Sequence, residues 1–134
     1  MNDPDVRKQK ILAIDDEPDV LALLKLLFES NGYDAVTAPN GTEGLIRAHV
    51  EHPDLILLDI MMEEMDGWET LERLKLDESS RDIPVVILSA RAEPKDKVRA
   101  LREGAVDYIV KPFSVRDSMD KIRAILDQEA EDPS

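Results

Sequence analysis

The sequence predicts an α/β fold: a doubly wound, five-stranded parallel sheet with helices on both faces. Short apolar runs alternate five times with helical patterns along the 134 residues. Three runs, at 11–14, 55–58 and 85–88, are continuously apolar, which is typical of parallel strands covered by helices on both faces. Because crossovers between parallel strands are right-handed, five such units give an open sheet rather than a meander.

The first two strand–helix units come before residue 54. The strand at 11–14 (ILAI) runs into acids, and the Asn-Gly pair at 31–32 suits the end of the helix that follows. Apolar residues in that helix follow the spacing of one helical face, at Val20, Leu23, Leu24, Leu27 and Phe28. A weaker strand at 35–38 (AVTA) precedes a helix over 41–51, which Pro53 ends.

Three more units complete the chain. The strand at 55–58 (LILL) ends in an acid, and a helix follows Gly67. The strand at 85–88 (VVIL) precedes a helix with Val98, Leu101 and Ala105 on its apolar side, ending at Gly104. The last strand covers 108–110. The final helix has its apolar residues at Val115, Met119, Ile122, Ile125 and Leu126.

Length and composition set the outer limits. We expect a lead-in over 1–9, one domain over 10–128 and a flexible polar tail over 129–134. The chain has no cysteine, no signal-peptide pattern and no apolar run near the roughly 18 residues of a membrane span, so we expect a cytoplasmic protein without membrane contact. Its net charge of −13 repels phosphate backbones, which argues against direct nucleic-acid binding.

Polar residues stand where four of the predicted strands end. Asp15 and Asp16 follow the first strand, Asp59 the third, Ser89 the fourth and Lys111 the fifth. A single aspartate at such a place is usually a turn former or helix cap. Together, however, they occupy the edge where doubly wound sheets carry their sites.

The charges suggest the chemistry of this edge. Close carboxylate pairs repel by roughly 4 kcal/mol at an effective dielectric near 20, so a cation is expected among them. Oxygen ligands without histidine or cysteine favour Mg²⁺, or Mn²⁺ in its place. An aspartate can also act as a nucleophile toward phosphorus. A serine hydroxyl and a lysine ammonium would then hold the phosphoryl oxygens.

With these residues in place, the chain resembles the receiver domain of two-component response regulators. The motifs are ILAIDDEPDV, PDLILLDIMMEEMDGWE, IPVVILSA and GAVDYIVKPF, in order, over about residues 9–128. The resemblance implies a flavodoxin-like (βα)5 fold with strand order 2-1-3-4-5. It also implies a switch that accepts a phosphoryl group from a histidine kinase.

The resemblance assigns the metal and acceptor residues one by one. Asp59 matches the phosphoacceptor. Asp16 matches a direct metal ligand, and Asp15 a ligand that acts mainly through water. Met61 matches the position whose backbone carbonyl completes the metal shell, so its side chain is not the ligand.

The same resemblance assigns the switch residues. Ser89 matches the hydroxyl that turns toward the phosphoryl group, and Lys111 matches the lysine that bonds it. Tyr108 matches the aromatic ring that moves into the space left by the serine. Lys111-Pro112 matches the family's cis peptide. In the family, phosphorylation changes the surface of the fourth helix, fifth strand and fifth helix.

The implied partners are a histidine kinase or phosphotransfer protein, a downstream effector or output domain, and a homodimer formed on phosphorylation. Such a domain catalyses its own phosphorylation and dephosphorylation, so we do not expect an enzyme with a separate substrate. One residue departs from the family pattern. Glu63 stands where the family usually has proline, four residues after Asp59.

Other readings of the sequence are weaker. A phosphatase of the haloacid dehalogenase-like type wants an acid two residues after its nucleophile, where this chain has Met61. A flavin-binding domain would not place acids after its first strand. A docking module that works without phosphorylation stays open. We assign Glu17 to the start of the first helix, where an acid is favourable, and His49 and His52 to the surface.

Overall fold

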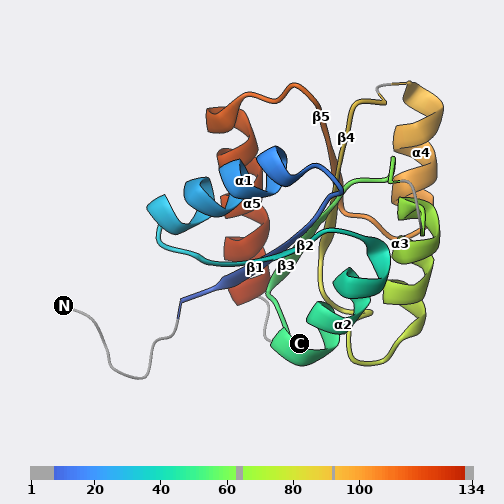
Figure 1. Ribbon diagram of the computed structural model, residues 1–134, viewed down its shortest axis with the longest axis horizontal. Coiled ribbons are helices and arrows are strands. Elements are labelled where there is room, and N and C mark those ends of the chain that lie inside the picture. The colour runs from blue at the N-terminus through green and yellow to red at the C-terminus, as the bar shows by residue number, and fades with distance from the viewer. Residues whose placement is uncertain (1–7, 63–64, 92, 132–134) are drawn as a thin grey trace.

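The computed structural model of the protein describes residues 8–62, 65–91 and 93–131. They form five strands that alternate with five helices (Figure 1). The strands are β1 (Lys10–Ile14), β2 (Asp34–Ala38), β3 (Leu55–Leu58), β4 (Val85–Ser89) and β5 (Asp107–Val110). The helices are α1 (Pro18–Ser30), α2 (Gly41–Glu51), α3 (Gly67–Leu76), α4 (Pro94–Arg102) and α5 (Val115–Glu131). None of the described helices is long and apolar enough to cross a membrane.

The five strands form one parallel sheet in the order β2-β1-β3-β4-β5, as expected. The chain therefore reverses its direction of winding between β1 and β3, and the carboxyl ends of these two strands lie side by side (Figure 1). In doubly wound sheets this reversal opens a crevice at the strand ends. The topology thus fixes the place of the site before any side chain is considered.

Two apolar layers cover the sheet. Alternate residues of each strand point to opposite faces, so Leu12 and Ile14 pack with α2, α3 and α4, whereas Ile11 and Ala13 pack with α1 and α5. All four residues of β3 are buried. The continuous apolar runs seen in the sequence are therefore the central strands of a sheet covered on both faces.

Helix ends follow from local chemistry. The Asn40 side chain accepts a hydrogen bond from the Glu43 N–H at the start of α2, and Asp66 does the same for Glu69 at the start of α3. Gly32, with φ of +89°, follows the C-cap of α1 in the left-handed conformation that glycine adopts without strain.

Three expectations need correction. Val98 and Leu101 do not form the buried side of α4; both are exposed, and the helix buries Asp96 and Ala100 instead. Leu23 is likewise exposed on α1, which buries Leu21, Leu24 and Phe28. The helix α5 continues to Glu131, past the expected start of the tail at 129, because alanine and glutamate there are good helix formers.

Candidate functional site

The carboxyl edge of the sheet brings the expected strand-end residues together. The Asp59 N–H bonds the Ile14 carbonyl at 2.9 Å, which joins the end of β3 to the end of β1. The Lys111 N–H bonds the Ser89 carbonyl at 2.8 Å, which joins β5 to β4 in the same way. The sheet ladder itself therefore positions the backbone of the site.

Lys111 is the centre of the charge arrangement. Its ammonium lies 2.8 Å from Asp15 Oδ2, 3.1 Å from Asp59 Oδ2 and 3.1 Å from Glu17 Oε1. An ammonium has three N–H donors, so these three carboxylates use all of them. Burial by itself would lower the pKa of Lys111, but the hydrogen bonds to Asp15 and Asp59 outweigh it and raise that pKa. Lys111 is therefore a permanent positive charge in the site.

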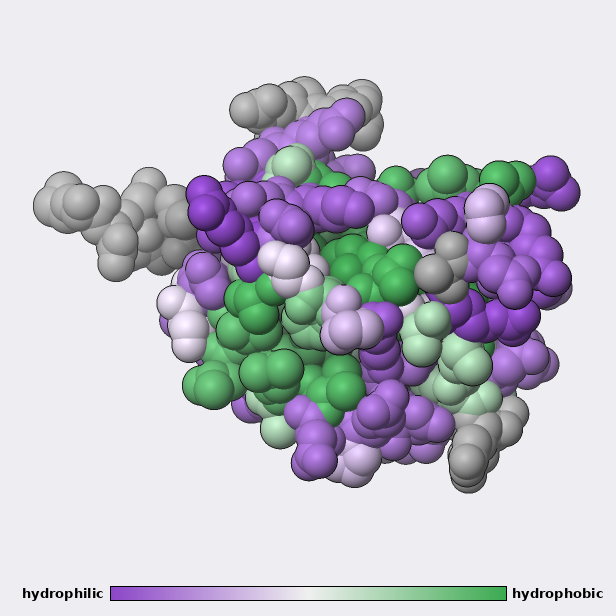
Figure 2. Space-filling model, turned by 90° about the horizontal axis from the view of Figure 1, so that it is seen from above, coloured by the Kyte–Doolittle hydropathy of each residue, from purple (hydrophilic) through white to green (hydrophobic). Residues whose placement is uncertain are grey.

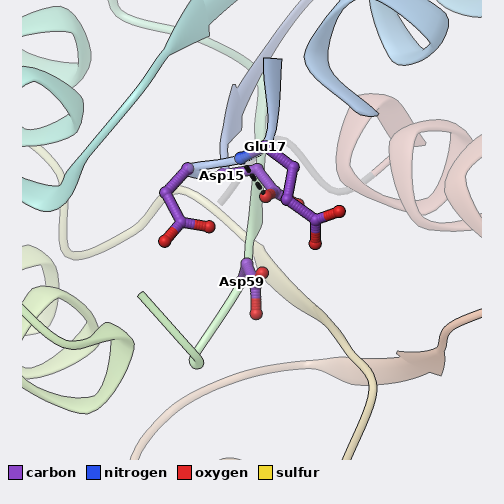
Figure 3. Close-up of side chains that lie close together, drawn as sticks. Asp15, Glu17 and Asp59 are labelled. Atoms are coloured by element: carbon purple, nitrogen blue, oxygen red, sulfur yellow. Dashed lines mark hydrogen bonds between the residues drawn. The ribbon is translucent and has the colours of Figure 1, made fainter. Parts of the chain in front are cut away.

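Asp15 and Asp59 are buried carboxylates. They are 1% and 3% exposed, and their second oxygens accept backbone N–H groups, from Glu17 at 2.9 Å and from Met61 at 2.8 Å. Burial raises the pKa of Asp15, and the Lys111 hydrogen bond opposes that rise. Figure 3 shows Asp15 and Glu17 after β1 and Asp59 at the end of β3, with the Glu17–Asp15 hydrogen bond dashed.

The acid cluster has four members rather than three. Carboxylate oxygens of Asp15, Asp16, Glu17 and Asp59 all lie within 4.8 Å of one another. Glu17 stands at the N-cap of α1, as expected, but its side chain makes no capping hydrogen bond and reaches Lys111 instead. The sequence did not indicate that Glu17 joins the cluster, because its side chain is directed by Lys111, which is distant in the sequence.

The donor set fits a hard divalent cation. Four carboxylates face one lysine in the described part of the site, which leaves an excess of negative charge. Oxygen-only ligands with partial solvent access match the preference of Mg²⁺ for one or two carboxylates together with water. The backbone of Met61 also lies at the site, since its N–H bonds Asp59.

Gly67 lets the segment after β3 approach the site closely. A Cβ at this position would lie 2.5 Å from the Asp59 carbonyl oxygen and closer still to the Ile60 Cα. The Gly67 N–H also bonds the Ile60 carbonyl at 3.2 Å. Only glycine fits here, because these neighbours are backbone atoms that cannot rotate aside.

Ser89 and Tyr108 meet at the backbone of a third residue. Ser89 Oγ accepts the Arg91 N–H at 3.2 Å, and the Tyr108 hydroxyl donates to the Arg91 carbonyl at 2.7 Å. Tyr108 is only 7% exposed, so its ring is already buried while Ser89 bonds Arg91. Burial raises the pKa of the Tyr108 hydroxyl, with the Ser89 hydroxyl opposing. The part of Arg91 in this arrangement was not apparent from the sequence.

Of the remaining expectations, two are confirmed and one lies outside the described residues. The Lys111-Pro112 peptide is cis, and His49 and His52 are exposed on or just after α2, as expected. Glu63 lies outside the described residues, so its effect on the site stays a prediction.

The sheet thus gathers carboxylates, a lysine and a serine along its carboxyl edge, the arrangement expected of a receiver domain. Residues 11–123 match the model of the response regulator receiver domain family. The chain belongs to that family, and its fold is the flavodoxin-like one of such domains.

Two curated relatives illustrate the likeness. The alkaline phosphatase synthesis transcriptional regulatory protein PhoP of Bacillus subtilis is 42% identical over 118 residues, or 88% of this chain and 48% of the relative. The DNA-binding dual master transcriptional regulator RpaA of Synechocystis is 40% identical over 87% of this chain and 48% of its own length. The chain thus spans about half the length of these relatives.

Solved structures of receiver domains have the same fold as this chain. The receiver domain of the Francisella response regulator 1452 superposes with a TM-score of 0.84 at 31% identity, covering 91% of this chain and 99% of that one. A CheY-like receiver domain protein from Methanospirillum hungatei gives a TM-score of 0.87 at 30% identity, covering 93% and 98%.

Proposed function

We propose that the protein is a phosphorylation-activated switch whose acceptor is Asp59. The observation that carries this is the placing of the Asp59 carboxylate: it is buried, flanked by Lys111 and surrounded by acids that need a cation. In the transfer, an Asp59 oxygen forms a bond to phosphorus while the bond from phosphorus to the donor nitrogen breaks. The electron pair of that bond returns to the donor imidazole.

Different residues of the site would bind the metal and contact the phosphoryl group. Asp15, Asp16, Asp59 and the Met61 carbonyl would hold Mg²⁺, or Mn²⁺ in its place. When bound, the metal supplies positive charge that offsets the carboxylates and the phosphoryl oxygens. Lys111 supplies a fixed ammonium to the same oxygens, and the Ser89 hydroxyl turns to them once they are present.

The donor is a histidine kinase or a phosphotransfer protein. The helix α1 begins beside the acid cluster and exposes Leu23 and Leu26. In Figure 2 an apolar area at the lower left lies over this helix. An apolar strip next to a phosphoacceptor suits a helical partner that presents its phosphohistidine to Asp59.

The output surface is formed by α4, β5 and α5. Val98, Leu101 and Val106 are exposed there, and a groove between Lys97, Phe113 and Lys121 borders Tyr108. Since Tyr108 bonds the segment after Ser89, phosphorylation can change this surface, to which an effector or a second copy then binds. The acidic chain itself does not contact nucleic acid, and the reaction turns over no separate substrate.

Phosphate uptake tests this proposal. Incubated with acetyl phosphate and Mg²⁺, the protein should gain one phosphate, as measured by intact mass, and Asp59→Asn should gain none because it lacks the nucleophilic oxygen. The control is Asp34→Asn, which removes an exposed carboxylate at the start of β2 and should label like the unaltered protein. Equal labelling of the Asp59→Asn variant and the unaltered protein would falsify the assignment.

The metal is tested separately through Asp16. We expect Asp16→Asn to raise the melting temperature without Mg²⁺, because the Asp16 carboxylate lies within 4.8 Å of the other acids. Like charges at such a separation repel by about 1 kcal/mol in water. The rise in melting temperature on adding Mg²⁺ should be lost, since a ligand is missing. Asp19→Asn, an exposed acid in the first turn of α1, should keep that rise. An undiminished Mg²⁺ effect in Asp16→Asn would exclude it as a ligand.

A further inference from the structure

Asp96 is a buried acid that the phosphoryl chemistry does not use. It lies in the first turn of α4 and is 6% exposed. Its Oδ2 has no hydrogen-bond partner among the described residues, and Arg91 Nε lies 3.5 Å away. A buried carboxylate is unfavourable without a counter-charge, so the Arg91 guanidinium is what makes this burial tolerable.

Arg91 is in turn held by the two switch residues. Its N–H donates to Ser89 Oγ at 3.2 Å, and its carbonyl accepts from the Tyr108 hydroxyl at 2.7 Å. Its guanidinium faces Asp96. One residue therefore connects the hydroxyl that would meet the phosphoryl group, the aromatic ring of β5 and the first turn of α4.

We propose that Asp96 is a positioning residue that, through Arg91, carries the movement of Ser89 on phosphorylation to α4. The inference rests on the proposed function. When Ser89 turns to a phosphoryl oxygen, the Arg91 N–H loses its acceptor and its segment readjusts. Because Asp96 is buried with no other partner among the described residues, the first turn of α4 follows Arg91 rather than leaving the carboxylate alone.

The chain contains its own reporter of α4. Trp68, the single tryptophan, lies at the start of α3, and the Arg99 guanidinium carbon of α4 is 4.0 Å from its ring centroid. Arg99 also pairs with Glu103 at 2.6 Å, which keeps it on the α4 side. A displacement of α4 thus changes the charge above the indole and its fluorescence.

The experiment follows phosphate uptake by intact mass and Trp68 fluorescence in the same samples. Asp96→Asn keeps the side-chain shape, so it should still take up phosphate from acetyl phosphate and Mg²⁺. We expect its phosphorylation-dependent fluorescence change to be at least about twofold smaller than that of the unaltered protein. Arg91→Gln, at a more exposed side chain, should give the same loss, and the double variant should add nothing further. Arg91→Lys, which keeps the charge, should retain part of the change.

The control is Glu93→Gln, which removes an exposed acid at the N-cap of α4 and should leave the change intact. If Glu93→Gln loses as much of the fluorescence change as Asp96→Asn, the effect comes from charge at the helix end and the proposal is overturned. The proposal is also overturned if Asp96→Asn keeps the full fluorescence change on phosphorylation. Uptake without any fluorescence change or altered amide exchange in α4 overturns this inference alone. Absence of uptake in the unaltered protein overturns the proposed function, and this inference with it.

Discussion

Replacing Lys111 with methionine should slow phosphorylation by about 10- to 100-fold, the effect of losing one charge-assisted hydrogen bond of about 1.5–3 kcal/mol. Methionine is similar in length and fits the space of a side chain that is largely buried. It supplies no donor to Asp59 Oδ2. The measurement is the rate of phosphate uptake from acetyl phosphate at saturating Mg²⁺, followed by intact mass.

Replacing Lys111 with methionine should also lower the stability of the fold. Without Lys111, the buried Asp15 and Asp59 face each other with no cation between them, so the melting temperature without Mg²⁺ should fall. Adding Mg²⁺ should then raise it by more than in the unaltered protein, because the metal is the remaining counter-charge. The control is Lys121→Met, which removes an exposed lysine that pairs with Asp107 at 3.8 Å. It should neither lower the melting temperature without Mg²⁺ nor enlarge the rise on adding Mg²⁺. An unchanged uptake rate in Lys111→Met would show that the ammonium does not assist the transfer.

Replacing Gly67 with alanine should impair folding and phosphorylation together. The added methyl group would lie 2.5 Å from the Asp59 carbonyl oxygen, and the backbone at Ile60 must move to admit it. Overpacking of this kind costs about 1–3 kcal/mol. A shift of about 1 Å at a reacting group can reduce a rate by about 100-fold. Urea unfolding and the rate of phosphate uptake measure the two effects.

Gly32→Ala separates the local cause from a general loss of stability. Gly32 has a φ of +89° but no atom within 4 Å of a new Cβ, so alanine there costs only backbone strain of roughly 1–2 kcal/mol. It should unfold more easily and still take up phosphate at the normal rate. If Gly67→Ala labels as fast as Gly32→Ala at equal loss of stability, the close approach of Gly67 does not matter to the site.

The sheet could be predicted from the sequence because its signal is local. Runs such as 55–58 are apolar throughout, and only a strand covered on both faces buries every residue. That Asp59 and Lys111 meet followed from the same reasoning, since parallel strands end at one edge. The acceptor role of Asp59 came from the family resemblance and stays a prediction.

The helix α4 shows where such reasoning ends. An apolar spacing in the sequence says which residues share a face, but not which face meets the sheet. In the structure Ala100 makes the close contact with the core, and Asp96 is buried by its pairing with Arg91. That pairing joins residues only five apart in the sequence, but an apolar spacing carries no sign of it. The reach of Glu17 to Lys111, by contrast, joins segments brought together only by the fold.

The helix α4 buries little apolar surface, so displacing it should cost little free energy. Its buried residues are one alanine and one acid, so a small displacement exposes almost no apolar surface to water. The local opening free energy of this helix should therefore be lower than that of α3, which buries Leu71 and Leu74. Amide exchange should therefore be faster in α4 than in α3 even before phosphorylation. Under the proposed function, a phosphoryl group would then only have to bias the position of a weakly anchored helix.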